Sequence, residues 1–400
     1  MFRRFLRAIG NPPIEVRLWD DSLVSTTRDK PIGCIVLADR ATLWKLAFDP
    51  LLQFGEAYAD GRIKVEGDLP QVLSVIFRIM NRIRKSPTLS GRVARIFTPR
   101  RGSDQQAALE NVHHHYDLGN DFYQLWLDDR MVYTCAYFER PEMTLEQAQV
   151  AKLDHVCRKL WLRPGETVVE AGCGWGALAI HMAQHYGVRV RACNISREQI
   201  AWAREQARRA GLRDRVEFIE DDWRNLRGEY DVFASVGMLE HVGFDNYTQL
   251  GELASGLLTP QGRGLIHTIG QNFPQPMNAW IERRIFPGAQ IPSISQMMDA
   301  FEPNDLSVLD IENLRLHYRK TLEHWLRRFD EVQDTVRDTF DDRFVRTWRL
   351  YLAGSIAAFD SGCMQLFQVA FAKAESNEIP WTRAHQYSPV HAELDPGYSI

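Results

Sequence analysis

Three glycines alternate with other residues directly after a short apolar run, in the order Glu170-Ala171-Gly172-Cys173-Gly174-Trp175-Gly176. Glycine lets a ligand approach the backbone closely, and a helix that begins beyond such a turn offers free N–H groups. The spacing Glu-x-Gly-x-Gly-x-Gly differs from the Gly-x-Gly-x-x-Gly of dinucleotide-binding folds. It therefore favours S-adenosylmethionine (SAM) over NAD as the ligand, with an ordinary glycine-rich turn as the alternative.

Four polar residues stand at comparable places further along the chain. Asn194, Asp222, Glu240 and His267 each fall just beyond, or at the end of, an apolar run that reads as a strand, as Gly172 does. Ligands of open parallel sheets bind beyond the carboxyl ends of the strands. The coincidence of five such residues predicts a single ligand crevice.

Regular alternation of strands and helices must position these residues. We expect strands at 167–171, 188–194, 216–219, 230–236, 264–269 and 365–371. We expect helices at 144–162, 177–183, 196–209 and 246–258, the first opened by a capping box of Thr144 with Gln147 and the third capped by Ser196. This pattern predicts an α/β fold with an open, largely parallel sheet and helices on both faces.

Composition sets limits on the class of protein. The chain has 400 residues, a formal net charge of −4 and 45% hydrophobic residues, which suggests about two globular domains and no nucleic-acid partner. Its six cysteines form no Cys-x-x-Cys pair, so neither a metal site nor a disulfide framework is indicated, and a reduced, cytoplasmic compartment is expected. No stretch approaches the ~20 apolar residues of a membrane span, so any contact with a membrane lies at its surface.

The chain divides into three parts in our interpretation. Residues 1–103 form a small unit with strands at 32–37 and 62–67, a helix at 69–83 and a basic linker. Residues 104–376 form the catalytic domain, in which the aromatic, helix-prone insertion 271–345 could cover the crevice. The tail 377–400 shows no periodicity and is expected to be mobile or loosely packed.

The stretch from Gln71 to Ser103 contains no acidic residue. It is either a solvated face with a linker or a surface that docks on anionic lipid. Its eight basic residues are Arg78, Arg82, Arg84, Lys85, Arg92, Arg95, Arg100 and Arg101.

Several motifs together resemble those of the cyclopropane-fatty-acyl-phospholipid synthases and the related mycolic acid cyclopropane synthases. They follow one another in the order of that family and span nearly all of the second unit. The matching segments are 115–123, 133–138, 170–176, 237–243, 267–269, 285–293 and 317–325, and residues 54–69 match the family's N-terminal domain more weakly.

The resemblance implies a class I SAM-dependent methyltransferase fold, which is Rossmann-like with a mostly parallel seven-stranded sheet, joined to a smaller N-terminal α+β domain. It implies transfer of a methylene from SAM to the cis double bond of unsaturated phospholipid acyl chains. It also implies a homodimer. From the acid-free basic stretch we expect the protein to associate peripherally with the inner, anionic face of the membrane.

Two sets of site residues follow. The resemblance implies a bicarbonate ion as the base, held near Cys135, Glu240, His267, Ile269 and Tyr318. With the loop and strand-end residues described above, the SAM-binding set is Tyr133, Thr134, Glu170, Gly172, Gly174, Gly176, Asn194, Ser196, Gln199, Asp222 and Trp223.

The chemistry of these residue types is consistent with that reaction. Methylation of an alkene leaves a carbocation, which requires a dry pocket with aromatic walls. Ring closure then requires a base, and a bicarbonate bound by donors from His267 and Tyr318 could give its O–H to Glu240. Cys135 is expected to act by position and not as a thiolate. The candidate walls are Tyr137, Phe138, Trp175, Phe273, Trp280 and Tyr318.

Two alternatives remain at this point. A fatty-acid methyltransferase of the same fold would leave a methylene or methyl branch where the synthase leaves a ring. A protein that binds SAM or lipid without catalysis would be expected to have lost Glu240, His267 or Tyr318, and all three are present.

Overall fold

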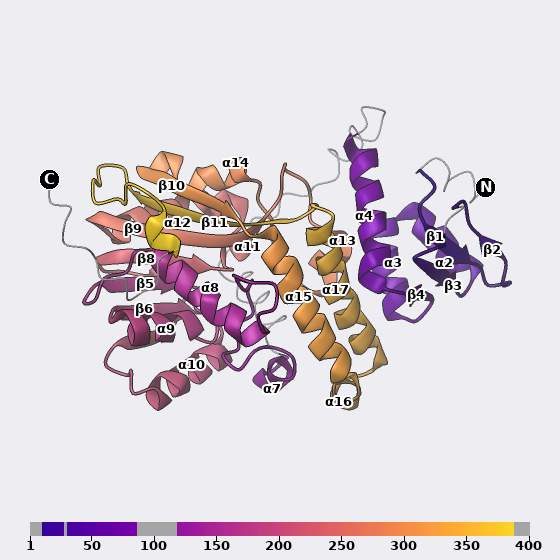
Figure 1. The fold of residues 1–400 in the computed structure, drawn as a ribbon, viewed down its shortest axis with the longest axis horizontal. Coiled ribbons are helices and arrows are strands. Elements are labelled where there is room, and N and C mark those ends of the chain that lie inside the picture. The colour runs from indigo at the N-terminus through magenta and orange to yellow at the C-terminus, as the bar shows by residue number, and fades with distance from the viewer. Residues whose placement is uncertain (1–9, 28–29, 86–117, 388–400) are drawn as a thin grey trace.

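The protein, described from a computed structural model that covers residues 10–27, 30–85 and 118–387, contains two sheets at opposite ends of an elongated molecule (Figure 1). A small four-stranded sheet lies at the N-terminal end, and a seven-stranded sheet forms the centre of the larger part. Helices α4 (Leu69–Lys85), α15 (Arg315–Glu331) and α17 (Asp342–Asp360) lie between the two sheets.

The large sheet has the strand order β10-β11-β9-β8-β5-β6-β7. Strand β11 pairs antiparallel with both of its neighbours, and the remaining pairs are parallel, which confirms the largely parallel seven-stranded sheet. Its strands are β5 (Thr167–Ala171), β6 (Arg189–Asn194), β7 (Val216–Glu220), β8 (Tyr230–Val236), β9 (Leu258–Gly270), β10 (Leu306–Asn313) and β11 (Gln365–Lys373).

Both faces of this sheet are buried, as the apolar strands predict. Val168 of β5 packs in one cluster with α8 (Leu145–Lys159), α9 (Ala177–Tyr186) and α10 (Arg197–Arg209). Its neighbour Val169 points to the other face and packs with α12 (Tyr247–Leu257). The expected helices therefore lie on both sides of the sheet, and the capping box of Thr144 with Gln147 opens α8 as predicted.

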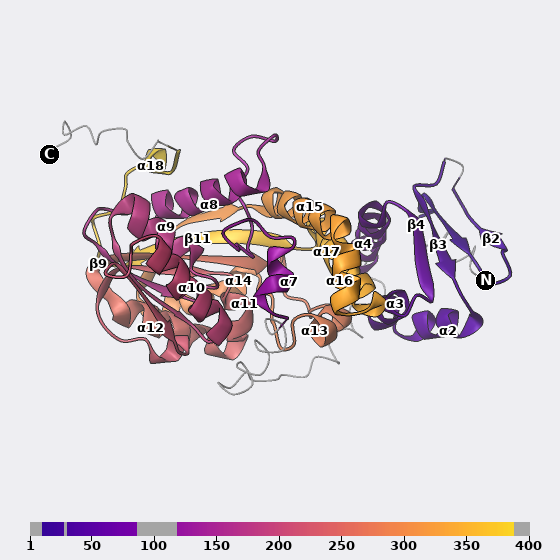
Figure 2. The same cartoon turned by 90° about the horizontal axis from the view of Figure 1, so that it is seen from below.

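The small unit combines strands with two short helices and one long helix. Strands β1 (Ile14–Arg17), β2 (Leu23–Val24), β3 (Gly33–Leu37) and β4 (Ile63–Gly67) form its sheet in the order β2-β1-β3-β4. Helices α2 (Arg40–Phe48) and α3 (Pro50–Ala59) connect β3 to β4, and α4 follows. Helix α4 packs along α17, so the small unit contacts the larger part directly (Figure 2).

The segment 271–345 differs from its prediction in one element. It contains α13 (Ala279–Arg284), α14 (Ile294–Met297), α15, α16 (Gln333–Thr339) and the start of α17, as its helix-prone sequence suggested. It also contains β10, the edge strand of the large sheet, which the prediction missed because Asp310 and Glu312 obscure the apolar pattern. The remaining short elements are α7 (Asn120–Gln124), α11 (Leu239–Val242) and the 3-10 helices η2 (Trp223–Asn225), η3 (Phe244–Asn246), η4 (Met298–Ala300) and η5 (Glu302–Asn304).

Part of the tail packs against the body of the protein, so the expectation of a loose tail is wrong for residues 384–387. Helix α18 (Ala384–Tyr387) packs on α8, and Gln386 is buried. Arg383 forms an ion pair with Asp310 at 2.8 Å. Residues 388–400 lie outside the described part of the chain.

Candidate active site

The glycine loop joins β5 to α9, and its three glycines have different tasks. All three have positive φ, at +80° for Gly172, +52° for Gly174 and +83° for Gly176. A Cβ on Gly172 would meet the Met238 side chain at 2.9 Å, and one on Gly176 would meet Phe218 at 2.6 Å. A Cβ on Gly174 would have no atom within 4 Å, because Gly174 faces the main pocket. Gly174 is thus the position where a ligand can lie against bare backbone.

The end of β6 supplies the next part of the pocket wall. Asn194 Nδ2 donates to Gln199 Oε1 at 2.5 Å, and both residues line the pocket. Ser196 Oγ accepts from the Gln199 backbone N–H at 3.4 Å and caps α10. Asp222 and Trp223, at the start of η2, also line the pocket and are nearly buried.

Two buried ionisable residues, Lys152 and Glu170, line the pocket near the loop. Lys152 of α8 is 2% exposed, and its Nζ donates to Thr134 Oγ1 at 2.9 Å. Burial lowers the pKa of Lys152 to about 8 and raises the pKa of Glu170 to about 8. Glu170 Oε2 has no hydrogen-bond partner among the described residues. The pocket thus offers a carboxyl group that a cationic ligand would ionise.

A second carboxyl group faces the pocket from α11. Glu240 is 6% exposed, and its Oε1 accepts from the Ile269 backbone N–H at 2.6 Å. Within the described ranges its Oε2 is buried without a partner. Burial raises the pKa of Glu240 to about 7. Ile269 therefore contributes its backbone N–H, which orients the Glu240 carboxylate.

His267 lines the pocket beside Glu240. It is 1% exposed, and Gln368 Nε2 lies 3.1 Å from its Nδ1, whereas its Nε2 is buried and unpartnered in the part of the chain that the structure describes. Cys135 is fully buried, and burial raises the pKa of its thiol far above the normal range, so it is not a thiolate. Tyr318 of α15 completes the set, and all five residues predicted for the base site line one pocket.

The pocket continues from this polar corner into an apolar half. Its volume is about 510 Å³. The apolar walls come from α3, α4, α13 and α17, so the small unit forms part of the same cavity. Gly55 of α3 allows Trp280 to pack closely, because a Cβ there would lie 2.3 Å from the indole. Representative wall residues are Phe54, Leu73, Phe77, Trp280, Phe286, Leu350, Tyr351, Phe359 and Leu366.

The aromatic walls were predicted with partial success. Trp175, Trp280 and Tyr318 line the pocket, but Tyr137, Phe138 and Phe273 do not. Tyr137 is stacked between the rings of His155 and His317, with centroids 4.1 and 4.8 Å away. Phe273 is 41% exposed. The prediction was wrong for these three because sequence order does not show which way a loop residue points.

Fourteen of the sixteen predicted site residues line the pocket, and Gly176 and Ser196 do not. Gly176 is the N-cap residue of α9, and Ser196 is the N-cap residue of α10. They therefore position the glycine loop and Gln199 without lining the pocket. The sequence analysis missed Lys152, Asn120 and Gln368. Asn120 Oδ1 accepts from Trp175 Nε1 at 2.7 Å and so orients an aromatic wall. The one feature of the sequence that could have pointed to Lys152 was its position within the apolar stripe of a helix.

Two regions named in the sequence analysis lie partly outside the described residues. These are 115–117 of the first motif and the basic residues Arg92, Arg95, Arg100 and Arg101. Of the remaining basic residues, Arg78 forms an ion pair with Asp360 at 2.6 Å, and Arg82 is exposed.

Comparison with known families gives two matches that together span most of the chain. A family model described as mycolic acid cyclopropane synthetase matches residues 103–369, and a domain of unknown function matches residues 1–86. A probable fatty acid methyltransferase of Pseudomonas putida is 34% identical over 94% of this chain and 96% of its own length. The cyclopropane-fatty-acyl-phospholipid synthase of Escherichia coli K12 is 39% identical over 66% of this chain and 68% of its own.

A solved structure of a relative shows the same fold. The mycolic acid cyclopropane synthase CmaA1, complexed with SAH and CTAB, is 31% identical to this chain with a TM-score of 0.63. The match covers 66% of this chain and 98% of CmaA1. This fold is that of the class I SAM-dependent methyltransferases.

Proposed function

This chain belongs to the mycolic acid cyclopropane synthetase family of SAM-dependent methyltransferases, and from that premise we propose that it is a cyclopropane-fatty-acyl-phospholipid synthase. Its substrate would be the cis double bond of an unsaturated acyl chain within a phospholipid. The product would be a three-membered ring that carries the methylene from SAM.

One observation carries the proposal. Glu240 Oε2 and His267 Nε2 are both buried polar atoms without partners in the described part of the chain, and their side chains line the pocket next to its apolar half. Leaving such atoms unpaired costs roughly 1–3 kcal/mol each. A binding site that retains two of them is therefore built for a small polar group next to an apolar chain.

The glycine loop fits SAM. Gly174 leaves room against its backbone, Asn194 and Gln199 offer amide groups, and Glu170 can ionise beside a cation. SAM bound there supplies a methyl group on a sulfonium, which is the electrophile that an alkene needs. The residues of the chain contribute orientation, since the methyl and the alkene must be held in van der Waals contact.

The polar corner fits bicarbonate. A carboxylate acceptor at Glu240, a ring nitrogen at His267 and the hydroxyl of Tyr318 suit an anion that both accepts hydrogen bonds and donates one. Bicarbonate bound there would supply a weakly nucleophilic base for the proton that ring closure releases. Glu240 is oriented for its part by the Ile269 N–H, and Cys135 fills space as a neutral thiol.

The apolar half of the pocket fits an acyl chain and excludes water. Trp175, Trp280 and Tyr318 present aromatic rings to the pocket, and such faces stabilise positive charge. The far wall comes from α3 and α4, so we infer that the small unit holds part of the acyl chain.

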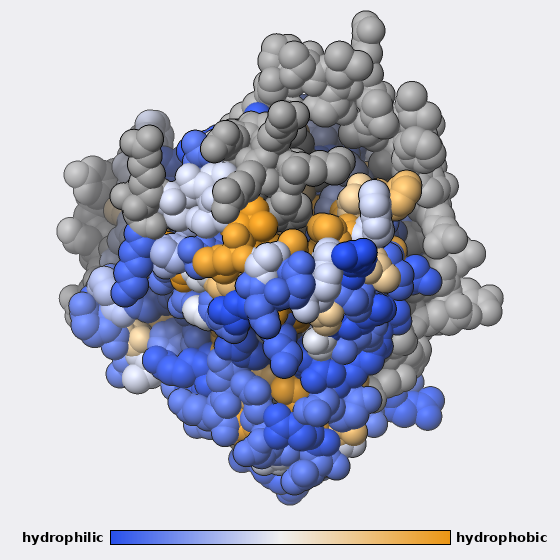
Figure 3. Space-filling model, turned by 90° about the vertical axis from the view of Figure 1, so that its right-hand side faces the viewer, coloured by the Kyte–Doolittle hydropathy of each residue, from blue (hydrophilic) through white to orange (hydrophobic). Residues whose placement is uncertain are grey.

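The proposal requires contact with a membrane surface. No helix among the described residues is long and apolar enough to cross a bilayer. On the end of the molecule that carries the small sheet, hydrophobic residues gather within an otherwise hydrophilic face (Figure 3). Helix α2 exposes Trp44 to 63% and Phe48 to 87%, and the neighbouring Leu46 and Pro50 line the pocket. These apolar side chains support entry of lipid at this end.

The basic stretch would add an electrostatic attraction to the same surface. Each basic residue near an anionic bilayer contributes about 1 kcal/mol, and salt screens the effect. Replacing Arg82, Arg84 and Lys85 with Gln should therefore weaken sedimentation with anionic vesicles at low salt, with SAM binding unchanged. Equal sedimentation of variant and wild type at low salt would rule out this docking surface. Homodimer formation remains a prediction.

The test of function is a product analysis. Purified protein, SAM and vesicles of a cis-unsaturated phospholipid should yield fatty acids heavier by one CH₂ that resist hydrogenation. Products that gain the same mass but are reduced by hydrogenation would instead indicate the methylene-forming fatty-acid methyltransferase. That second function is favoured by the name of the Pseudomonas putida relative, whose match covers nearly the whole chain.

A further inference from the structure

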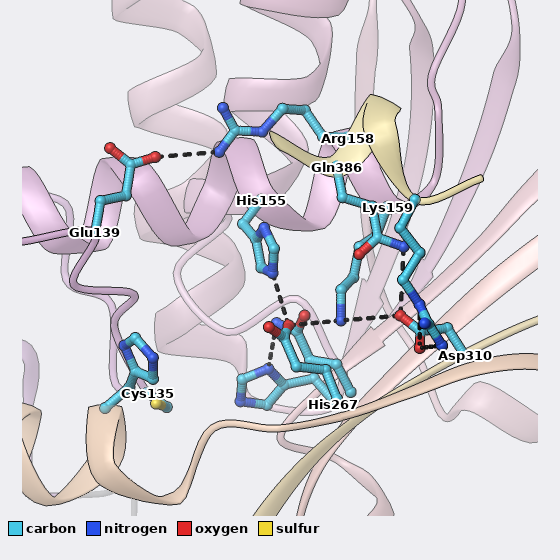
Figure 4. A network of polar contacts seen from close by, with 12 residues as sticks. Cys135, Glu139, His155, Arg158, Lys159, His267, Asp310 and Gln386 are labelled. Carbon is cyan, nitrogen blue, oxygen red and sulfur yellow. Dashed lines mark hydrogen bonds and ion pairs between the residues drawn. The ribbon is translucent and has the colours of Figure 1, made fainter. Parts of the chain in front are cut away.

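Three polar side chains form a row across the antiparallel part of the large sheet. Glu312 of β10 is the register partner of Gln368 on β11, and Gln368 is the register partner of His267 on β9. Residues directly opposite each other on antiparallel strands point to the same face. This row faces α8, from which His155 and Lys159 point toward the strands (Figure 4). The row thus runs from the sheet edge to the pocket.

His267 is neutral in this environment. Burial lowers its pKa well below the usual value, and the positive charges of Lys152 and Lys159 act in the same direction. Glu312 and His155 also interact with it, with opposite signs. Glu240 faces the same pocket from α11. A neutral imidazole carries one N–H, so the chemistry of the pocket depends on which nitrogen holds the proton.

The contact at Nδ1 decides this question. Gln368 Nε2 lies 3.1 Å from His267 Nδ1. An amide NH₂ only donates, so Nδ1 must accept and the proton must be on Nε2. With the amide turned around, Nδ1 would hold the proton and Nε2 would present a lone pair to the pocket.

Glu312 stands next to Gln368 at the outer end of this row. Its Oε2 is bound by His155 Nε2 at 2.7 Å and Lys159 Nζ at 2.8 Å, and these contacts help to lower its pKa to about 2. It is therefore ionised and held at the position directly opposite Gln368. The Gln368 Oε1 has no hydrogen-bond partner among the described residues, so the contact of Nε2 with His267 Nδ1 sets the amide orientation.

We propose that Gln368 is a positioning residue that fixes His267 as the Nε2–H tautomer, so that the imidazole presents a hydrogen-bond donor to the pocket opposite the Glu240 carboxylate. The inference rests on the proposed function. It adds a reason why the site accepts an oxyanion that carries an O–H: His267 donates a hydrogen bond to the ligand, and Glu240 accepts one from it. With the opposite tautomer, two acceptors would face the anion and repel it.

The test uses ¹⁵N-histidine NMR of the free protein, with the His267 signals assigned by a His267→Gln variant. The wild type should show His267 protonated at Nε2 and unprotonated at Nδ1. Gln368→Glu places an acceptor at Nδ1 and should move the proton to Nδ1 or give the cation. Gln368→Met keeps the volume without the bond and should give a mixture of tautomers.

The functional readout is the bicarbonate concentration needed for half-maximal activity. It should rise about tenfold in Gln368→Met and further in Gln368→Glu. SAM binding should not change, because Gln368 does not line the pocket. The control is Gln365→Met, on the same strand as Gln368, which loses the part-buried hydrogen bonds to Asn313 and Gly362 but has no hydrogen bond to His267. Its tautomer and bicarbonate dependence should match the wild type.

The outcomes separate this inference from the proposed function. A wild-type His267 protonated at Nδ1, or a tautomer that is unchanged in both Gln368 variants, overturns the inference. If the tautomer responds as expected but bicarbonate affects no variant, the positioning role stands and the choice of bicarbonate fails. If Gln365→Met alters the tautomer equally, the effect belongs to strand packing and the inference falls.

Discussion

Replacing Gly174 with Ala tests the cofactor site most directly, because the free protein has space for the added methyl group. No atom lies within 4 Å of a Cβ at this position, so the variant should fold without a clash. The new side chain instead occupies the surface against which SAM would lie. The same change at Gly172 or Gly176 would collide with protein atoms and confuse binding with folding.

The structure allows both effects to be estimated. At φ +52° an L-residue in the left-handed region costs roughly 1–2 kcal/mol of stability. Forcing one methyl into a close-packed contact typically costs about 1–3 kcal/mol, which here is lost from binding. That range weakens the Kd for SAM by about 5- to 140-fold. Gly174→Val should abolish binding, since a β-branched residue suits this backbone still less.

Isothermal calorimetry with SAM and a thermal unfolding scan would measure the two effects separately. Gly211→Ala is the matched control, because Gly211 has φ +70°, has no neighbour within 4 Å and lies away from the pocket. It should lose similar stability and bind SAM normally. Wild-type affinity in Gly174→Ala would refute the assignment of this loop to the cofactor.

Three further predictions concern the base site and the membrane. Glu240→Gln should lower turnover by about 10²–10⁴-fold with SAM binding retained. Bicarbonate-free buffer should lower the activity of the wild type by a similar factor. Full activity of the wild type without bicarbonate, or loss of its activity on adding a chelator, would contradict this prediction. Because burial raises the pKa of Glu240 from 4.5 to about 7, the native state holds an extra proton between these values, so the free energy of unfolding should fall as pH rises through that window. Comparing denaturant titrations of wild type and Glu240→Gln across this window should show that the variant lacks that fall. Trp44→Ser with Phe48→Ser should weaken sedimentation with vesicles by at least about tenfold even at high salt, whereas Trp381→Ser, which removes a side chain that is 94% exposed, should not.

Much of the pocket lining could be predicted because strand order and strand ends follow from local patterns. The apolar runs located β5, β6 and β8, and the rule that ligands bind at carboxyl ends placed Gly172, Asn194 and Glu240 around one crevice. These inferences need only the direction of each strand.

The parts that failed depend on contacts between distant segments. Strand β10 contains Asp310 and Glu312, whose charges are stabilised by Arg383 and by Lys159 of α8. A sequence pattern treats such residues as exposed, so the strand was read as helix-prone insertion. Gln368 was read only as part of an apolar strand, since its partner His267 lies 101 positions away.

The place of β11 in the sheet has a consequence for synthesis on the ribosome. This strand is the last in the chain but lies between β9 and β10. A nascent chain that has emerged through β8 already contains the glycine loop. Once β9 has emerged as well, its outer edge stays unpaired until residues 365–373 appear. The apolar half of the pocket likewise waits for Leu350, Phe359 and Leu366. Translation order therefore completes the glycine loop before the apolar half of the pocket, which needs residues of α17 and of the last strand.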